Sequence, residues 1–508
     1  MSESPEFEII PSETTSPNTA PATVEPADPP AVSSTIEPIL ASDQSEEIVY
    51  LEPKFSICII CKNGEATLPD LAQSIQHFIR GGGQVVLLDT GSTDNTVELS
   101  RSLGFDVHIA EKPFVTSLNK MEARNLLEKW CDPSEAKRIP FRNGASCFPF
   151  GPARNAVAQL AKHDLVLHLD ASDQVYSLDI DFINTLIDSG LNSLYYGLSN
   201  KLKDSHAEGM ATTNRFYDRR LQRWEGTTHE ELYAVDRNAG SNIRMSRVPM
   251  DGLRVIHIRQ ENKSRDGYLI GCGIDVIKNP RNAQMVHNLG RQLFYAGFEA
   301  SALKVLTKHL TMESSITSRR SLSACFIAQI WVKRSAKEQD AVKLELAKMK
   351  ALNREPDDNS ILEMAKRVTK LLDHARDAYH KAFELDCGWR APIMGLADLA
   401  MRLKDWDRAI FWARAADTIQ RTSLVSEDAS FYVYAIDEIL LKAYFGLWKK
   451  AIQDKASNAN ALFAEAHAAW QRCKEVADWL GSVKKFAEIF DYDEEFARQA
   501  VQTGDFKE

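Results

Sequence analysis

Two aspartates stand three positions apart where an apolar run ends, in the segment "DLVLHLDASD". Asp170 closes the run and Asp173 follows in the same short turn. Two carboxylates held this close repel each other unless a cation lies between them. Mg²⁺ or Mn²⁺, bound by one or two carboxylates together with substrate phosphates, suits such a pair. The residues alone leave one alternative, which is a solvated acidic turn without a ligand.

A third aspartate ends another apolar run, in "VVLLDTGSTDNT". Asp89 is followed by small and polar residues that let the backbone approach a ligand closely. An aspartate at the end of a parallel strand can accept hydrogen bonds from a ribose or a base edge. The alternative is a polar strand exit that caps the next helix through Ser92, Thr93 or Asp94.

Basic and further acidic candidates follow in separate segments. Arg154 in "FGPARNAVAQL" is suited to anchor a phosphate or the aspartate turn, or it is a surface arginine at a helix start. His229 and Glu230 lie together in the loop-like segment "RWEGTTHEELY", and His257 ends the predicted strand "LRVIHI". A single histidine is more often structural than a ligand, but these residues accompany two aspartates.

The elements that must position these residues alternate between strand and helix from Phe55 to about Gly197. Predicted strands are "FSICIIC", "QVVLLD", "DVHIA" and "DLVLHLD", with helical patterns between them. Nearly continuous apolar strands that alternate with helices indicate a mainly parallel sheet covered on both faces, an α/β fold. Right-handed crossovers then bring the strand ends to one edge, where ligands bind.

The pattern changes in three later regions. Residues 112–149 form a long insertion with one predicted helix, and residues 194–259 read as short strands and loops. After about residue 262 the pattern is helical to the end. A weak self-similarity places a small residue 12 positions before an alanine at Gly290 and Ala302, and again at Ala397 and Ala409. Because Ala375 and Ala409 are 34 residues apart, we expect degenerate tetratricopeptide-like repeats, with a plain helical bundle as the alternative.

Composition bounds the remaining questions. The 508 residues predict more than one domain. Ten of the 71 acidic residues and eight of the 19 prolines fall in the first 50 residues, which predicts a disordered acidic tail over 1–52. The remainder is balanced at 61 basic and 61 acidic residues and offers no overall basic field for nucleic acid. With neither a signal peptide nor a transmembrane run, we expect a soluble cytoplasmic protein.

The eight cysteines are scattered along the chain. Cys58 and Cys61 form a CxxC pair, but "FSICIIC" is a predicted strand on which residues three apart face opposite ways. Buried thiols are therefore expected rather than a metal site. Cys131 and Cys147 flank an irregular stretch within the insertion, where pairing is a possibility.

Taken in order, these segments resemble family-2 glycosyltransferases with the GT-A fold, in the subgroup that carries tetratricopeptide-like helices after the transferase domain. The resemblance rests on "ICIICKNGEATL", "VVLLDTGSTDNT", "FGPARNAVAQLAKHDLVLHLDASD", "RWEGTTHEEL" and "RVIHI", over about residues 53–260. It implies a GT-A domain over 53–262 and a helical domain over 263–508. It also implies a nucleoside-diphosphate sugar as donor, with a UDP-sugar favoured, and Mn²⁺ or Mg²⁺ as cofactor.

The resemblance further implies roles for the donor-binding residues. Asn63 and Glu65 would lie in the first donor-binding loop, Asp89 would contact the uridine, and Arg154 would hold the donor beside the aspartate turn. Asp170 and Asp173 would stand for the family's Asp-x-Asp, which holds ribose and the diphosphate-bound metal.

The aspartate turn departs from the family pattern, because Asp-Ala-Ser-Asp is one residue longer than the usual spacing. That departure leaves open which of Asp170, Ser172 and Asp173 contacts the metal, or whether the metal site is weakened or lost. His257 matches a histidine that often follows this domain and is a candidate third ligand.

The expected reaction is transfer of a hexosyl group with inversion. Glu230 is the expected base and His229 would orient it or contact the acceptor, with Asp173 as the second candidate for a direct role. The helical domain would bind a protein or glycan acceptor on a concave face. The alternative function is a catalytically inactive scaffold that binds nucleotide sugars. A nucleotidyltransferase is disfavoured because "CKNGEATL" has a single glycine and no glycine-rich basic loop.

Overall fold

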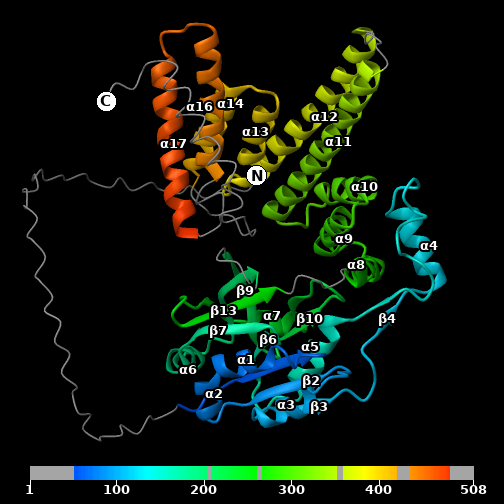
Figure 1. Cartoon of the computed structure of the whole chain (residues 1–508). Coiled ribbons are helices and arrows are strands. Elements are labelled where there is room, and N and C mark those ends of the chain that lie inside the picture. Colours follow the sequence, from blue (N-terminus) through cyan, green and yellow to red (C-terminus); the bar gives the residue numbers. More distant parts are fainter. Residues whose placement is uncertain (1–50, 203–207, 260–265, 352–357, 420–434, 481–508) are drawn as a thin grey trace, which may run out of the picture. The chain divides into compact units, whose positions relative to one another are not determined.

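The computed structural model describes residues 51–202, 208–259, 266–351, 358–419 and 435–480. The predicted acidic tail lies almost entirely outside the described residues. The described chain combines a nine-stranded sheet near its start with helices from residue 266 onward, as the sequence predicts (Figure 1). Among these residues, no helix is both long enough and apolar enough to cross a membrane.

One half of the sheet is parallel and carries the predicted strand ends. Its strands lie in the order β3, β2, β1, β6, and they span Asp106–Ile109, Val85–Asp89, Ser56–Cys61 and Leu165–Asp170. Cys61 pairs with Asp89 on one side, and Ile60 pairs with Asp170 on the other. The two aspartates therefore leave the sheet at the same edge, on either side of β1.

The other half of the sheet is mixed. It continues from β6 through β9, β8, β13 and β7, with β12 beside β8, and these span Glu208–Asp218, Ser193–Leu202, Leu253–Arg259, Asp173–Leu178 and Met245–Arg247. The prediction of only short strands after residue 194 is wrong for β8 and β9, which have 10 and 11 residues. They pair with each other antiparallel over nearly their whole length, which allows both to be long.

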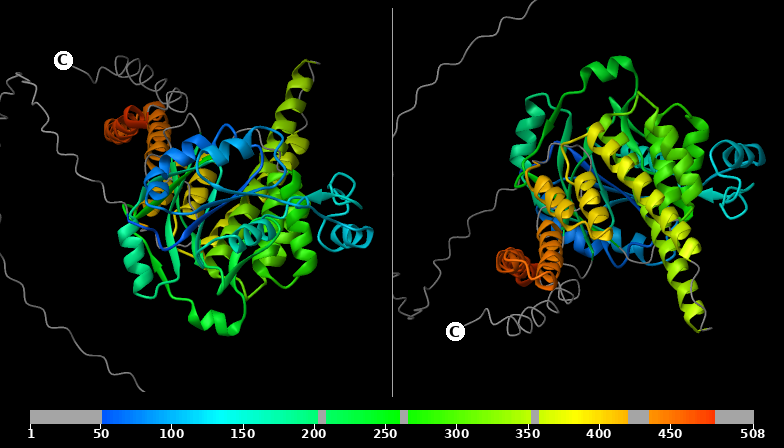
Figure 2. Two further views of the ribbon diagram at one scale, coloured as in Figure 1. Left: turned by 90° about the horizontal axis from the view of Figure 1, so that it is seen from below. Right: turned by 90° about the horizontal axis from the view of Figure 1, so that it is seen from above.

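Helices cover both faces of the sheet (Figures 1 and 2). One face packs against α1 (Leu68–Ser74), α2 (Gln76–Arg80) and α6 (Ile180–Asp188), and the other against α5 (Phe150–Gln159). The helix α3, Thr96–Ser102, follows β2. The cores confirm the strand prediction for the two cysteines of the CxxC, since Cys61 belongs to the first face and Cys58 to the second.

The insertion contains the predicted helix, α4 (Lys120–Lys129), and a small ladder of β4 (Thr116–Ser117) and β5 (Ser146–Cys147). A reciprocal capping box between Asn119 and Glu122 fixes the start of α4. All eight cysteines, including Cys131 and Cys147, are free thiols, so the possible pairing of these two is not formed.

The first helices after the sheet share a core with this insertion. They are α8 (Asp266–Lys278), α9 (Ala283–Tyr295) and α10 (Glu299–Leu310), and Leu126 of α4 is buried among their apolar side chains. The predicted domain division at residues 262 and 263 stays a prediction, because this core joins residues from both sides of it.

The helical region contains pairs of two different sizes. Helices α9 and α10 pack as a short hairpin, with Leu306 against Gly290, and α13 (Ala391–Arg402) and α14 (Trp406–Asp417) form a similar one. The pair α11 (Thr317–Ala351) and α12 (Asp358–Leu385) has 35 and 28 residues, too long for a 34-residue repeat of two helices. Helices α16 (Ala435–Gln453) and α17 (Ala459–Leu480) complete the described chain. The region is therefore all-helical, and its repeats are irregular.

Candidate functional site

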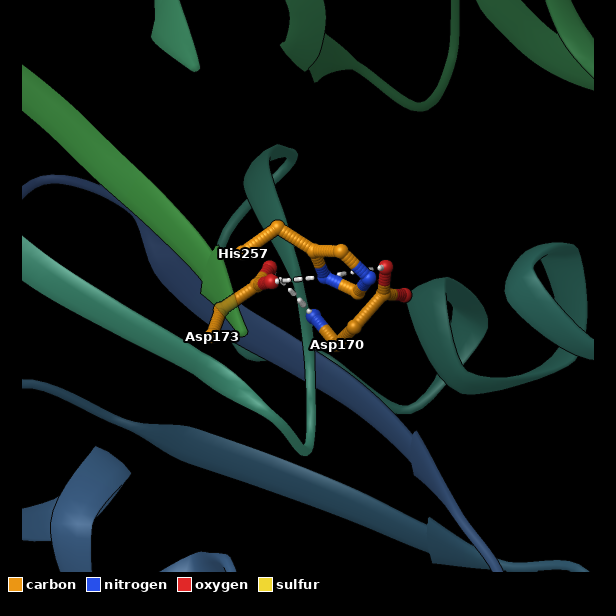
Figure 3. A group of neighbouring side chains, drawn as sticks. All are labelled: Asp170, Asp173 and His257. Atoms are coloured by element: carbon orange, nitrogen blue, oxygen red, sulfur yellow. Dashed lines mark hydrogen bonds and ion pairs between the residues drawn. The ribbon is translucent and has the colours of Figure 1, made fainter. Parts of the chain in front are cut away.

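Three of the predicted ligands converge at the edge of the sheet (Figure 3). Asp170 ends β6, Asp173 begins β7, and His257 on β13 is paired with Asp173 across the ladder. The backbone N–H of Asp170 donates to Asp173 Oδ2 at 2.8 Å. His257 Nδ1 lies 2.7 Å from Asp173 Oδ1 and 3.8 Å from Asp170 Oδ2. Alternation of strand and turn therefore gathers residues 84 positions apart into one cluster.

The donor set of this cluster fits a divalent cation. One ligand atom from each of Asp170, Asp173 and His257 lies within 4.8 Å of the others. Carboxylate oxygens suit Mg²⁺ and Mn²⁺, and an imidazole nitrogen is acceptable to Mn²⁺. The Asp173 side chain is 1 % exposed whereas that of Asp170 is 25 % exposed, so Asp170 is the carboxylate of the cluster that solvent reaches.

Arg154 connects this cluster to the predicted base. It lies on α5, where its Nη2 donates to Asp170 Oδ1 at 2.8 Å and its Nε to Glu230 Oε1 at 2.7 Å. The side chain is only 4 % exposed and stacks on Trp224, with 5.3 Å from the guanidinium carbon to the ring centre. Its Nη1 is buried and has no hydrogen-bond partner among the described residues, so its donor capacity is not exhausted.

A second guanidinium in the site, that of Arg215, was not predicted from the sequence. Its Nη1 donates to the other oxygen of Asp170, Oδ2, at 2.9 Å and lies 3.7 Å from Asp173 Oδ2. Arg215 is the extra residue of a β-bulge, because Leu194 pairs with Phe216 while Tyr195 pairs with Asn214. A bulge turns a side chain out of the regular alternation. The sequence carries no clear signal for it.

Burial and charge have opposite effects on the pKa values at the acidic turn, which is the aspartate turn of residues 170–173. Burial alone would raise the pKa of Asp170, but the charges of Arg215 and Arg154 outweigh it and hold that pKa well below the ordinary value. Burial likewise disfavours the charged forms of the two arginines, and Asp170 overcomes this and raises both arginine pKa values. The pairs are therefore ionised at neutral pH.

The loop that carries Glu230 is held between two helices by glycine contacts. It connects β10 (Gln222–Glu225) to β11 (Glu231–Ala234). Gly226 adopts φ +105°, and its carbonyl oxygen would lie only 2.4 Å from a Cβ at Gly151 of α5. On the other side, a Cβ at Gly271 of α8 would clash with Thr228. Both helices can approach the loop only because they present glycine there.

The helical region also bonds this loop directly. Asp275 of α8 accepts from the N–H of Thr227 at 2.7 and 2.8 Å and from that of Thr228 at 3.3 Å. After the base candidate, Glu231 pairs with Arg319 of α11 at 3.2 Å. Contacts on both sides of Glu230 thus come from helices that follow the sheet in sequence.

His229 lies at the same boundary, with a positive φ of 54°. Its Nε2 is 2.7 Å from Gln292 of α9, and its ring packs against Tyr268 of α8. It also lines a small pocket between the β10–β11 hairpin and helices α8 and α9, together with Glu231, Asp275 and Asn288. These contacts of His229 are toward the helices. Its predicted role in orienting Glu230 stays a prediction.

The predicted donor loops are bonded to each other at the end of β1 and β2. The Asn63 side-chain oxygen accepts from the N–H of Thr93, and Glu65 accepts from that of Asn95. Asp89 is 3 % exposed and accepts from the N–H groups of Gly91 and Ser92 in its own turn. These bonds shape the turn, and contact between Asp89 and a uridine stays a prediction.

Comparison with known proteins gives only distant structural likenesses. No protein-family model matches the chain, and no curated protein matches it. Among solved structures, S. aureus TarS matches 54 % of the chain at 15 % identity and a TM-score of 0.31, and the match spans about half (52 %) of TarS. A TarS fragment solved in complex with UDP matches 56 % of the chain and is itself covered to 92 %, at 15 % identity and a TM-score of 0.33.

Two further solved proteins match different shares of the chain. MamA matches 42 % of the chain and is covered to 91 %, at 13 % identity and a TM-score of 0.26. Glucosyl-3-phosphoglycerate synthase from Mycobacterium tuberculosis, solved with Mn²⁺, uridine diphosphate and glucosyl-3-phosphoglycerate, matches 30 % and is covered to 45 %, at 20 % identity and a TM-score of 0.17.

Proposed function

We propose that the protein is a glycosyltransferase that moves a sugar from a nucleoside-diphosphate sugar, favourably a UDP-sugar, to a hydroxyl acceptor. The observation that carries this proposal is the bridge made by Arg154. One buried guanidinium bonds Asp170 of the acidic turn and Glu230 of the base loop at 2.8 and 2.7 Å. The motifs that predicted a donor site and a base thus meet in a single cluster, at the strand edge where ligands of α/β sheets bind.

The proposed binding of the donor follows from the charges of the cluster. Asp170, Asp173 and His257 would hold Mn²⁺ or Mg²⁺, and Arg154 would face the diphosphate beside them. A divalent cation bound there offsets the negative charge that develops on the leaving diphosphate. Asp89, Asn63 and Glu65 would shape the nucleoside side of the site.

The proposed chemical step uses Glu230 as base. Its carboxylate takes the proton of the acceptor hydroxyl while that oxygen forms a bond to the anomeric carbon of the sugar. The bond from this carbon to the phosphate oxygen breaks, and the nucleoside diphosphate leaves with the electron pair, which inverts the anomeric centre. Arg154 supports this role because its bond to Oε1 fixes the carboxylate, which is 11 % exposed. Base assistance of this kind contributes about 100- to 10,000-fold to a rate.

A screen of nucleotide sugars tests the proposal. The full chain is incubated with UDP- and GDP-sugars and Mn²⁺, and release of nucleoside diphosphate is measured with and without EDTA. We expect hydrolysis of at least one donor that EDTA and Asp170→Ala each abolish. Asp398→Ala serves as control, because Asp398 is an exposed residue of α13 paired with Arg402.

Two results would contradict the proposal. Turnover by Asp170→Ala at the wild-type rate would remove the acidic turn from the site. Tight nucleotide-sugar binding without turnover of any donor, with or without added acceptors such as glycans and peptides, would favour the inactive scaffold.

A further inference from the structure

The acidic turn already contains a cation of the protein's own. Arg215 Nη1 donates to Asp170 Oδ2 at 2.9 Å and lies 3.7 Å from Asp173 Oδ2, so it lies between the two carboxylates. His257 Nδ1 approaches the same Asp170 oxygen at 3.8 Å. Asp170 and Asp173 are the carboxylates that would ligate a metal. The guanidinium and a divalent cation therefore need the same oxygens.

The placement of Arg215 is built into the sheet. It is the unpaired residue of the β-bulge in β9, next to Phe216. The pair of Phe216 with Leu167 is where the ladder between β9 and β6 ends. Beyond that pair, β6 runs on to Asp170 without β9 partners. The bulge turns the side chain toward the space that opens there, and bulges beside sites commonly re-aim a side chain in this way.

Charge decides what the cluster can accept. The carboxylates of Asp170, Asp173 and Glu230 face two guanidinium groups, so a single negative charge is left when His257 is neutral. Adding a divalent cation alone makes the cluster positive and brings it against Arg215. Adding it with a diphosphate restores the balance, and the diphosphate offers Arg215 new oxygens, to which guanidinium binds in a fork.

We propose that Arg215 is the counter-ion of the acidic turn and competes with the divalent cation for its carboxylates. When a nucleoside diphosphate binds, its oxygens bind the guanidinium and leave the carboxylates to the cation. This inference rests on the proposed function for the identity of the ligand. It makes Arg215 a positioning residue that couples metal binding to donor binding.

Binding of Mn²⁺ alone and of UDP alone tests the inference without any turnover. Mn²⁺ affinity is measured from the free-ion signal in electron paramagnetic resonance, and UDP affinity by calorimetry in EDTA. For Arg215→Gln we expect Mn²⁺ to bind at least about fivefold more tightly than to wild type, the lower end of typical coupling between sites. We expect UDP in EDTA to bind more weakly to this variant, because the guanidinium no longer meets the diphosphate.

Arg220→Gln is the matched control. Arg220 lies just past the C-terminal end of β9, is exposed, and pairs with Asp218 and Asp164 near the start of β6, at the opposite end of β6 from Asp170. Its Mn²⁺ and UDP affinities should equal those of wild type. Should the glutamine variant not fold, Arg215→Met keeps an unbranched apolar stem without the charge and gives the same expectation.

Equal Mn²⁺ affinity in wild type and in a folded Arg215 variant would overturn the inference. A second overturning result needs no variant: wild type binds UDP, but the bound UDP leaves its Mn²⁺ affinity unchanged. Failure of the proposed function has a different signature. Wild type would then bind no nucleoside diphosphate in Mn²⁺ or in EDTA, while the Mn²⁺ titration of the variants would still report on the counter-ion.

Discussion

At the scale of single residues, the site is organised around one carboxylate. Asp170 receives Arg154 on one oxygen and Arg215 on the other. The sequence predicted Asp170 and Arg154 because each lies in a local motif, at a strand end or a helix start. It did not predict Arg215, because its position depends on a bulge that strand propensities do not encode. Local motifs thus identified Asp170 and Arg154, and tertiary pairing supplied the second counter-charge, Arg215.

The proposed base gives a prediction at this scale. Glu230→Gln keeps the shape of the side chain and an oxygen for Arg154 but removes the basic carboxylate. We expect donor binding to be kept while the transfer rate at saturating substrate falls about 100- to 10,000-fold. The control is Glu225→Gln, since Glu225 begins the same loop and pairs with Arg223. Transfer by Glu230→Gln at the wild-type rate would assign the base elsewhere, with Asp173 the next candidate.

At the scale of elements, the loop of residues 226–230, which carries Glu230, depends on the close approach of two helices. The sequence predicted the strands and helices before Gly197 because their apolar patterns are regular. It could not predict that Gly151 of α5 and Gly271 of α8 pack closely against residues 226–228, because these contacts join distant segments. Glycine there is a packing requirement, and the carboxylate of Asp275 adds the hydrogen bonds.

Adding one methyl group tests this packing. In Gly151→Ala the new Cβ would lie 2.4 Å from the carbonyl oxygen of Gly226, so the loop must shift. We expect the free energy of unfolding to fall by about 1–3 kcal/mol, as for other overpacked sites. Denaturant unfolding measures it. Gly267→Ala on α8 is the control, because its Cβ would meet Cys147 at an ordinary 3.7 Å. Equal free energies of unfolding for Gly151→Ala and wild type would show that the loop is not tightly packed against α5 at this position.

At the scale of the whole molecule, the helical region is part of the site's support as well as a candidate acceptor surface. Helices α8, α9 and α11 contact the loop around Glu230 through Asp275, Gln292 and Arg319. The sequence predicted an all-helical region but not the lengths of α11 and α12, since helical periodicity does not show where consecutive helices pack. Two buried histidines, His287 of α9 and His309 of α10, lie where these helices meet α11.

The histidines give the molecule a predicted acid sensitivity. His287 Nδ1 bonds Ser323, which bonds His309 Nδ1, and His309 Nε2 bonds Ser315. Burial, with the charges of Arg319 and Arg320, lowers the pKa of His309 to about 4. Below pH ~6.5 the imidazole of His309 therefore binds a proton in the unfolded chain, whereas in the folded chain it stays neutral until the pH approaches 4. The contribution of His309 to the free energy of unfolding is therefore complete above pH ~6.5, and it falls by ~3 kcal/mol as the pH drops from there to 4.

Thermal unfolding between pH 7.5 and 4.5 measures this loss. In His309→Gln the fall of Tm with decreasing pH should be shallower than in wild type, although the variant is less stable at pH 7.5. His374→Gln should keep the wild-type slope, because His374 lies on α12 against Trp331 at an exposed position. An unchanged slope in His309→Gln would show that His309 does not titrate in this window.

We expect a cation and a nucleoside diphosphate to meet at the acidic turn. A crystal grown with UDP and MnCl₂, with data collected at the manganese absorption edge, tests it most directly. We expect an anomalous peak among Asp170, Asp173 and His257, in contact with diphosphate oxygens, and Arg215 turned from Asp170 to the diphosphate. Ordered UDP with no manganese at these three residues, or manganese and UDP bound at another edge of the sheet, would contradict it.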